Sequence, residues 1–292
     1  MSINFKAPQI EAFETSNKKH SDLIDDKEGF DLLAELIKEF TGIHLPNNEK
    51  NRTLMAGRMG PLLNRNGLSS YAELAKRIGL KASPHLKEEF ISSITTNTTQ
   101  FFRESNHYEV LKNYMSQRMN DRNFNSHSFR VWCSACSSGQ EAYSILFTLM
   151  QSGYDFKKHQ LEFLATDIDL AILKKASRGV YSAEEVNPLP LEVKRHFSPF
   201  VGKYKITNEL REIITFARFN LIQDKPNFKE KFDVIFCRNV LIYFEKEVST
   251  AVIDMLISQL KPGGILFLGH VETGLLKNKH VQAISHAVYK KV

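Results

Sequence analysis

The sequence predicts an α/β domain with a mostly parallel sheet, preceded by an all-helical domain. Two observations lead to this prediction. From Phe30 to Met119, apolar residues recur at intervals of three and four, which is the period of amphipathic helices. From Phe129 onward, short β-branched and aromatic runs alternate with helical stretches, as expected for parallel strands joined by crossover helices.

The first part of the chain divides into a polar start and a helical region. Residues 1–27 mix Asn, Ser, Lys and Asp with few apolar positions, so we expect a flexible N-terminus. A polar run at residues 120–128 predicts a linker, which places a helical domain at residues 28–119. Within it the spacing predicts helices at residues 30–41, 71–78, 86–94 and 108–119.

Residues 129–292 then form the predicted α/β domain. We expect a small antiparallel insertion at about residues 181–211, because three prolines and two short strand-like segments, hinged at Gly202-Lys203, interrupt the alternation there. Strands are predicted at residues 129–133, 161–166, 213–219, 232–237, 265–268 and 287–290, and helices at residues 140–150, 170–176 and 246–260.

Length and composition exclude several classes of protein. A chain of 292 residues corresponds to about two domains, and 42% hydrophobic residues suffice for a sizeable core, which excludes a disordered or collagen-like chain. The three cysteines are too few for a disulfide framework, and Cys133 and Cys136 have no second pair, so we expect no metal site. No apolar stretch approaches the ~18 residues of a membrane span and no signal peptide begins the chain, which predicts a cytoplasmic protein without membrane insertion.

Charge is unevenly distributed along the chain. Residues 1–48 carry five lysines and arginines against nine acidic residues, whereas residues 49–122 carry twelve against seven. The formal net charge of the whole chain is +6. A basic body attracts nucleic acid, anionic membranes or acidic protein surfaces, and charge alone does not choose among them.

Acidic side chains follow the first two predicted strands. The first strand leads into a loop of small residues and then Glu141, which can be either a helix-dipole partner or a ribose contact. This loop contains Gly139 but lacks GxGxxG, so an ordinary turn and a cofactor site explain it equally well. Asp167 ends the second strand, where it can accept hydrogen bonds from ribose hydroxyls or cap the next helix, a task that Asp169 could equally perform.

Two further segments carry polar residues in unusual places. Arg238 and Asn239 interrupt an apolar run at residues 232–244, and burying an unpaired arginine is costly, so we expect Arg238 to face an acidic ligand or a carboxylate such as Glu141 or Asp167. Upstream, helix capping and core packing explain the threonines and phenylalanines of residues 94–104 better than they explain Arg103.

Taken in order, these segments resemble the CheR family of chemotaxis receptor methyltransferases, which transfer a methyl group from S-adenosylmethionine to receptor glutamates. The resemblance covers the chain from about Phe30 to the C-terminus. The matching motifs are NxTxFFR at 97–103, WxxxCSxGxExYS at 132–144, ATDID at 165–169, FxxxNL at 216–221, FCRNVLIYF at 236–244 and PGGxLFLGHxE at 262–272.

The resemblance implies a Rossmann-like S-adenosylmethionine methyltransferase domain with an antiparallel β-subdomain, after an all-helical N-terminal domain. It further implies that Arg103 and Tyr243 lie near the transferred methyl, with Arg103 positioning the substrate carboxylate. The residues implied to bind S-adenosylmethionine, and its product S-adenosylhomocysteine, are Asn97, Thr99, Arg103, Glu141, Asp167, Asn220, Leu221, Arg238 and Asn239.

The resemblance also implies a partner. In the family, N-terminal helices contact the acidic cytoplasmic helices of methyl-accepting chemotaxis receptors, and Lys50, Arg52, Arg58 and Arg65 fall in the corresponding region. We expect Gly60-Pro61 to interrupt this helix. The short turn around Gly202 predicts weak or absent binding of the receptor's C-terminal pentapeptide, and we expect a monomer.

Two alternative functions stay open at this point. One is a non-catalytic S-adenosylmethionine-binding signalling adaptor, which nothing in the motifs favours. The other is a methyltransferase for a different substrate such as nucleic acid, which the basic charge would permit. No nucleic acid partner is expected, because the segment after the fourth predicted strand lacks the Asn/Asp-Pro-Pro-Tyr loop that amino methyltransferases present to a base.

Overall fold

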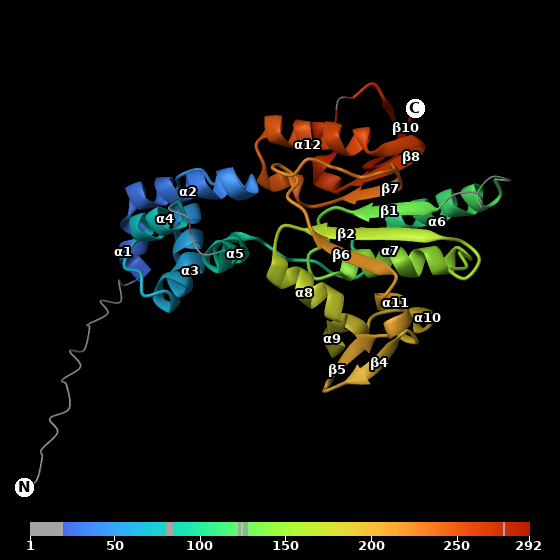
Figure 1. Cartoon of the computed structure of the whole chain (residues 1–292), viewed down its shortest axis with the longest axis horizontal. Coiled ribbons are helices and arrows are strands. Elements are labelled where there is room, and N and C mark those ends of the chain that lie inside the picture. Colours follow the sequence, from blue (N-terminus) through green and yellow to red (C-terminus); the bar gives the residue numbers. More distant parts are fainter. Residues whose placement is uncertain (1–19, 80–83, 122–123, 125–127, 277) are drawn as a thin grey trace, which may run out of the picture. The chain divides into compact units, whose positions relative to one another are not determined.

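The computed structural model describes residues 20–79, 84–121, 124, 128–276 and 278–292. These residues form two compact units (Figure 1). The first unit contains the described residues up to Leu36 together with Leu45–Ser93, and the second contains Ile37–His44 and Ile94–Val292. Residues 1–19 of the predicted flexible N-terminus lie outside the described residues.

The first unit is all helical, as the sequence predicts. Its helices are α1 (His20–Asp25), α2 (Lys27–Thr41), whose last turn belongs to the second unit, α3 (Glu49–Arg65), α4 (Tyr71–Gly79) and α5 (Pro84–Ile94). Helix α1 corrects the expectation that the chain is flexible as far as residue 27. The buried side chain of Leu23 stabilises this helix by packing against α3 beside Gly60. A Cβ on Gly60 would lie 3.7 Å from Leu23 Cδ1.

Helix α3 runs through Gly60-Pro61 without a break, which corrects the predicted interruption. Asn48 caps its N-terminus by accepting a hydrogen bond from the Asn51 N–H at 2.9 Å. Met59, Leu62 and Leu63 are buried on both sides of Pro61. Packing of this apolar face therefore outweighs the backbone hydrogen bond that proline cannot make.

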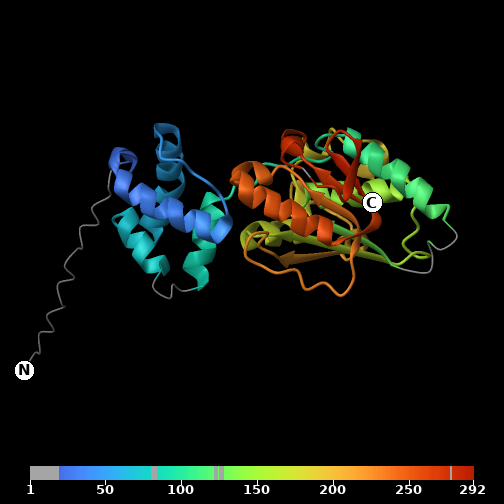
Figure 2. The same ribbon diagram turned by 90° about the horizontal axis from the view of Figure 1, so that it is seen from above.

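A seven-stranded sheet organises the second unit (Figures 1 and 2). The strand order is β6-β2-β1-β7-β8-β10-β9, and β10 alone runs antiparallel to both of its neighbours. This topology confirms the predicted Rossmann-like class. The strands are β1 (Phe129–Cys133), β2 (Leu161–Asp167), β6 (Ile214–Arg218), β7 (Phe232–Cys237), β8 (Leu260–Leu268), β9 (Val281–Ser285) and β10 (Val288–Lys291).

Helices pack on both faces of this sheet. Apolar side chains along β1 alternate between the two faces, so both faces must be covered. Val131 and Cys133 point into one core, which they share with helices α6 and α7, whereas Trp132 points into the other core with helix α12. The helices of this unit are α6 (Asn106–Met119), α7 (Gln140–Gln151), α8 (Leu170–Arg178), α9 (Ala183–Val186), α10 (Leu191–Lys194), α11 (Asn208–Arg211), α12 (Lys246–Ser258) and the 3-10 helices η2 (Leu241–Tyr243) and η3 (His270–Leu275).

The boundary between the two units differs from the predicted linker at residues 120–128. It falls between Ser93 and Ile94, so helix α6 belongs to the α/β unit rather than to a helical domain at 28–119. The physical reason is the buried face of α6. Tyr108, Leu111 and Met115 lie in the same core as strand β1 and helix α7.

The predicted antiparallel insertion is confirmed as a three-stranded sheet of order β3-β5-β4. Its strands are β3 (Val180–Tyr181), β4 (Phe197–Phe200) and β5 (Lys203–Ile206). Phe200 pairs with Lys203, so the hairpin turn contains only Val201 and Gly202, both with positive φ. The turn is as short as the sequence predicts.

Candidate active site

A pocket of about 880 Å³, partly open to solvent, lies at the carboxyl ends of β1, β2 and β7. Strand β1 stands between β2 and β7, the point where strand order reverses and where open α/β sheets bind ligands. The pocket brings together the predicted residues Asn97, Thr99, Arg103, Glu141, Asp167, Asn220, Leu221, Arg238, Asn239 and Tyr243.

Asp167 faces the pocket from the end of β2. Its two carboxylate oxygens accept hydrogen bonds from the backbone N–H groups of Ser137 (2.8 Å) and Asp169 (3.1 Å). Burial raises its pKa from 3.8 to about 6. The capping task belongs to Asp169, whose side chain accepts from the N–H groups of Ala171 and Ile172, so Asp167 is not the cap of α8.

The loop between β1 and α7 forms another wall. Gly139 has φ +94°, and a Cβ at this position would lie 2.9 Å from the Tyr181 hydroxyl and 3.2 Å from the Ala176 Cα. Glycine is therefore required here for close packing against α8 and β3. Ser137, which lines the pocket, donates from its hydroxyl to the Asn97 carbonyl at 3.0 Å.

The segment before α6 crosses the pocket as residues 95–99 and Arg103. The Asn97 carboxamide donates to Asp169 Oδ2 at 3.0 Å, which attaches this segment to the start of α8. Arg103 donates from Nη1 to the Thr98 carbonyl at 3.3 Å. The side chains of Asn97 and Arg103 thus help to fix the backbone of the pocket wall.

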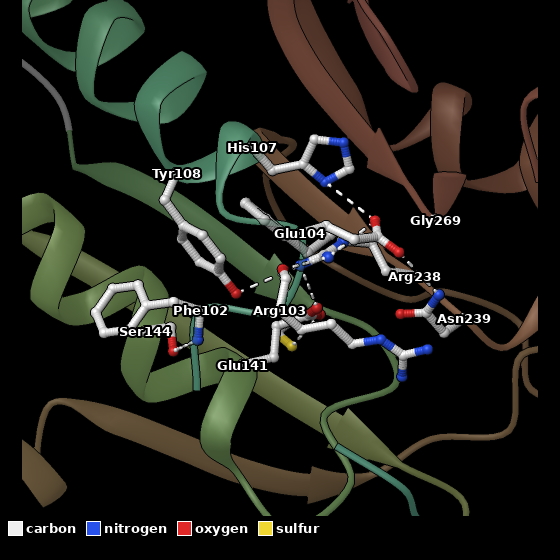
Figure 3. A network of polar contacts seen from close by, with 12 residues as sticks. Phe102, Arg103, Glu104, His107, Tyr108, Glu141, Ser144, Arg238, Asn239 and Gly269 are labelled. Atoms are coloured by element: carbon white, nitrogen blue, oxygen red, sulfur yellow. Dashed lines mark hydrogen bonds and ion pairs between the residues drawn. The ribbon is translucent and has the colours of Figure 1, made fainter. Parts of the chain in front are cut away.

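Arg238 follows β7 and lies between two carboxylates (Figure 3). Its fully buried guanidinium approaches Glu141 Oε2 at 2.9 Å and Glu104 Oε2 at 3.0 Å, so the predicted Arg238–Glu141 contact is confirmed. Burial alone would lower the pKa of Arg238, but Glu141, Tyr108 and Glu104 outweigh it and raise the pKa, which keeps the guanidinium charged.

Asn239 and the residues after it are held by a carboxylate that the sequence analysis did not single out. The fully buried side chain of Glu272 accepts hydrogen bonds from four backbone N–H groups, including those of Asn239 (3.1 Å) and Val240 (2.9 Å). Asn239 has φ +58°, a conformation that asparagine tolerates better than most residues. The signal for Glu272 was its place at the end of PGGxLFLGHxE, the last motif of the family resemblance.

Asn220 lies in the pocket wall, but its side chain forms hydrogen bonds with the protein backbone. Its Nδ2 donates to the Phe40 carbonyl at 2.8 Å, and its Oδ1 accepts from the Ile222 N–H at 3.1 Å. Thr41 and Ile43 follow Phe40 and also line the pocket. Sequence reasoning missed both, because it assigned the end of this helix to the other domain.

The predicted docking residues Lys50, Arg52, Arg58 and Arg65 all lie on helix α3 of the first unit and do not line the pocket. Lys50 and Arg65 are exposed. Arg52 is already engaged, because Nε donates to the Ile24 carbonyl at 3.1 Å and Nη1 donates to Asn47 Oδ1 at 2.8 Å.

The lining residues suit binding and alignment of a polar ligand. Two buried carboxylates, Glu141 and Asp167, can accept hydrogen bonds from sugar hydroxyls, and apolar side chains such as Phe219 and Leu221 line the same pocket. The nearby thiol of Cys133 donates to Glu141 at 3.3 Å, and burial raises its pKa well above the usual value, so it is a poor nucleophile. These residues therefore fit S-adenosylmethionine better than they fit covalent catalysis.

A doubly wound sheet with such a pocket at its switch point defines an α/β protein that binds a ligand at the carboxyl ends of its parallel strands. The family models identify it further. The model described as CheR methyltransferase, SAM binding domain, matches residues 97–290, and the model described as CheR methyltransferase, all-alpha domain, matches residues 28–95. The chain therefore belongs to the CheR methyltransferase family, and it is an S-adenosylmethionine-dependent methyltransferase.

Curated relatives align over most of the chain. The chemotaxis protein methyltransferase 2 of Pseudomonas aeruginosa is 32% identical, covering 90% of this chain and 92% of its own length. The chemotaxis protein methyltransferase of Borreliella burgdorferi is 31% identical, with 94% and 98% covered. That of Escherichia coli is 34% identical, with 83% of each chain covered.

The division between the two family models agrees with the boundary between the structural units. Both place it near residues 93–97, ahead of helix α6. Among the described residues, no helix combines the length and the apolar character needed to span a membrane.

Proposed function

We propose that this chain methylates glutamate side chains on chemotaxis receptors, using S-adenosylmethionine and forming glutamate methyl esters for sensory adaptation. The observation that carries the proposal is one pocket that all ten predicted catalytic and cofactor-binding residues line. The names of the relatives, chemotaxis protein methyltransferases matched over at least 83% of their own length in the three cases above, support the same substrate class.

The lining residues agree with carboxylate methylation. When bound, S-adenosylmethionine supplies an electrophilic methyl group on a sulfonium sulfur. A glutamate carboxylate, with an ordinary pKa of ~4.3, is ionised at neutral pH and needs no general base. In the transfer a carboxylate oxygen forms the O–CH₃ bond while the S–CH₃ bond breaks and its electron pair stays on sulfur, giving a neutral ester and a thioether.

In this proposal, Asp167 and Glu141 accept hydrogen bonds from the ribose, and Arg103 positions the substrate carboxylate. Tyr243, half-buried at the pocket wall, shapes the methyl channel. Alignment of the reacting atoms away from water supplies most of the acceleration. An arginine that paired too tightly would weaken the carboxylate as a nucleophile, so its role is to orient rather than to clamp.

We assign receptor docking to the exposed face of helix α3. At about 100° per residue, Lys50, Arg58 and Arg65 fall within an arc of about 80°, while Arg52 lies outside it. The contacts of Arg52 with Ile24 and Asn47 give it a structural task, so the docking proposal now rests on the exposed Lys50 and Arg65. An acidic receptor helix is the partner that this charge favours.

The test is transfer of radiolabelled methyl from S-adenosylmethionine to membranes that contain chemoreceptors, followed by mild alkali. Carboxylate esters release methanol under these conditions, whereas methylated amines do not. Alkali-labile label on receptors is the expected result. Cofactor binding without any receptor labelling would contradict the proposed substrate.

The adaptor alternative and the nucleic acid alternative are not favoured. Glu141, Asp167 and Arg238 are all present and assembled, and the relatives matched over most of the chain are named methyltransferases. Beyond β7 the chain continues as Arg238-Asn239-Val240 without a proline pair. Binding to duplex DNA that weakens steeply with salt would favour the nucleic acid alternative instead.

A further inference from the structure

Glu104 lies directly behind the wall of the pocket. It follows Arg103 in the chain and is not itself a lining residue. Its carboxylate nevertheless contacts two lining residues, with Oε2 3.0 Å from Arg238 Nη2 and Oε1 accepting from Asn239 Nδ2 at 3.2 Å (Figure 3). Arg238 lowers the pKa of Glu104 against the opposing effect of burial, so this carboxylate is ionised at neutral pH.

Arg238 links the carboxylate of Glu104 to the backbone of Arg103. Its Nη2 donates to the Arg103 carbonyl at 2.6 Å, while its Nη1 contacts Glu141. A guanidinium is planar and presents its donors in a rigid fork, so two carboxylates on different sides fix its orientation. Glu104 and Glu141 therefore determine where Arg238 holds the backbone of Arg103.

The backbone around Arg103 needs such support. Phe102 and Glu104, the residues on either side, have φ of +52° and +56°, which is unfavourable for residues other than glycine. The Phe102 N–H donates to the Ser144 hydroxyl at 2.9 Å, and Glu104 is held by Arg238 and Asn239. The side chain of Arg103 thus projects into the pocket from a backbone that is fixed on both sides.

Two histidines complete the surroundings of Glu104. His107 Nδ1 lies 3.6 Å from Glu104 Oε2, and His270 Nε2 lies 3.7 Å from the same oxygen. Three such ligand atoms could in principle hold a metal ion. The guanidinium of Arg238 already lies 3.0 Å from this oxygen and would repel a second cation, so the geometry favours a positioning role for the cluster.

We infer that Glu104 is a positioning residue, which acts through Arg238 and Asn239 to shape the cofactor pocket and to aim Arg103. It contacts neither cofactor nor substrate in this assignment. Loss of its carboxylate should loosen one wall of the pocket and free the Arg103 backbone, with the rest of the pocket unchanged. Only the part of the inference that concerns methyl transfer rests on the proposed function.

The experiment measures S-adenosylhomocysteine affinity by calorimetry on the full chain, below the unfolding temperature of every variant. We expect Glu104→Ala to raise Kd about tenfold, because it removes one ion pair with Arg238 and one charge-assisted hydrogen bond from Asn239 in the pocket wall. Glu104→Gln, which keeps an acceptor for Asn239, should recover most of the affinity. Glu109→Ala removes an exposed acidic residue on α6, five positions further along the chain; it is the matched control and should leave Kd unchanged.

A merely structural role would lower the unfolding temperature without this pattern in Kd. Wild-type affinity in Glu104→Ala, or equal losses in the Ala and Gln variants, would overturn the inference. Both results are obtained without any receptor, so they are independent of the proposed substrate.

Methyl transfer to receptors then tests the link to Arg103. Since Glu104 acts through Arg103 in this step, kcat of the double variant Arg103→Ala/Glu104→Ala should equal that of Arg103→Ala within about twofold. Losses that multiply would show that Glu104 does not aim Arg103. If wild-type protein labels no receptor, the proposed substrate fails while the affinity series still decides the inference.

Discussion

At the scale of single residues, ionisation of Asp167 should make the ligand affinity of the pocket depend on pH. Its pKa of about 6 means that the carboxylate is ionised at neutral pH and protonated below it. A protonated carboxyl group is a weaker acceptor for ribose hydroxyls, so affinity for S-adenosylhomocysteine should fall as pH drops through 6. At pH 5 about one tenth of the carboxylate remains, which predicts a Kd about tenfold above its value at pH 8.

Calorimetry from pH 8 to pH 5 measures this dependence, with Asp167→Asn as the comparison. The variant should bind weakly at every pH, and the pH dependence that belongs to Asp167 should disappear from it. A wild-type Kd that stays constant between pH 8 and pH 5 would contradict the assignment of Asp167 to the cofactor.

Arg103 gives a second prediction at this scale. Arg103→Ala should lower kcat about tenfold to a hundredfold, because a misplaced substrate carboxylate loses alignment with the methyl group. Kd for S-adenosylhomocysteine should change by less than about threefold if the main task of Arg103 concerns the substrate. Filter-bound methyl transfer and calorimetry measure the two quantities, and an unchanged kcat would remove the assignment.

Some of these site residues could be predicted from the sequence, and others could not. The ends of predicted strands located Asp167 and Arg238, because parallel strands bring their carboxyl ends to one edge of a sheet. Glu104 and Glu272 stand in the segments 94–104 and 262–272, but no local feature of the sequence predicts a role for either. Their roles depend on tertiary contacts with Arg238 and with the backbone of residues 239–241, which no local pattern encodes.

At the scale of elements, helix α3 carries the docking prediction. Lys50→Ala/Arg65→Ala should raise KM for receptor membranes about fivefold to tenfold at low salt, because exposed charges attract an acidic partner over roughly one Debye length. The difference should shrink at high salt, where these charges are screened. The kcat value and the affinity for S-adenosylhomocysteine should stay unchanged.

A matched control removes two exposed lysines from other helices, Lys76→Ala/Lys174→Ala. It should leave KM for the receptor unchanged at both salt concentrations. If the control raises KM as much as the α3 variant does, the effect belongs to net charge and the docking face is not on α3.

Element prediction worked where periodicity was strong and failed where tertiary packing decided. Pro61 suggested a break in α3, but buried neighbours keep the helix continuous. Helix α6 looked like its N-terminal neighbours, and only the partners of Tyr108 and Leu111 assign it to the α/β unit. Strand β9 was missed because it is a short, mostly exposed edge strand, and its sequence VQAIS shows no regular alternation of apolar and polar residues.

At the scale of the whole molecule, the α/β unit includes a short piece of the N-terminal sequence. Ile37–His44 supplies the Phe40 carbonyl to Asn220, and Thr41 and Ile43 to the pocket. A fragment of residues 94–292 therefore lacks part of the pocket wall and leaves Asn220 Nδ2 without its acceptor, the Phe40 carbonyl. We expect it to bind S-adenosylhomocysteine at least about tenfold more weakly than the full chain.

A fragment that keeps residues 37–44, joined to residue 94 by a flexible glycine-serine linker, separates this effect from loss of the helical unit. It should bind more tightly than residues 94–292 alone, provided that circular dichroism shows both fragments folded. Full affinity in the shorter fragment would show that Thr41 and Ile43 contribute little to binding.

The chain passes between the two units three times, at residues 36/37, 44/45 and 93/94. The helical unit is therefore not a simple N-terminal extension, because most of it is inserted in the sequence between two segments of the catalytic unit, 37–44 and 94–292. Exchange of modules between family members would therefore succeed at these three junctions, by replacing residues 45–93 together with the helices before residue 37 and leaving 37–44 native. Hybrids joined only at residue 94 would import a foreign pocket wall, so receptor preference and cofactor affinity would change together.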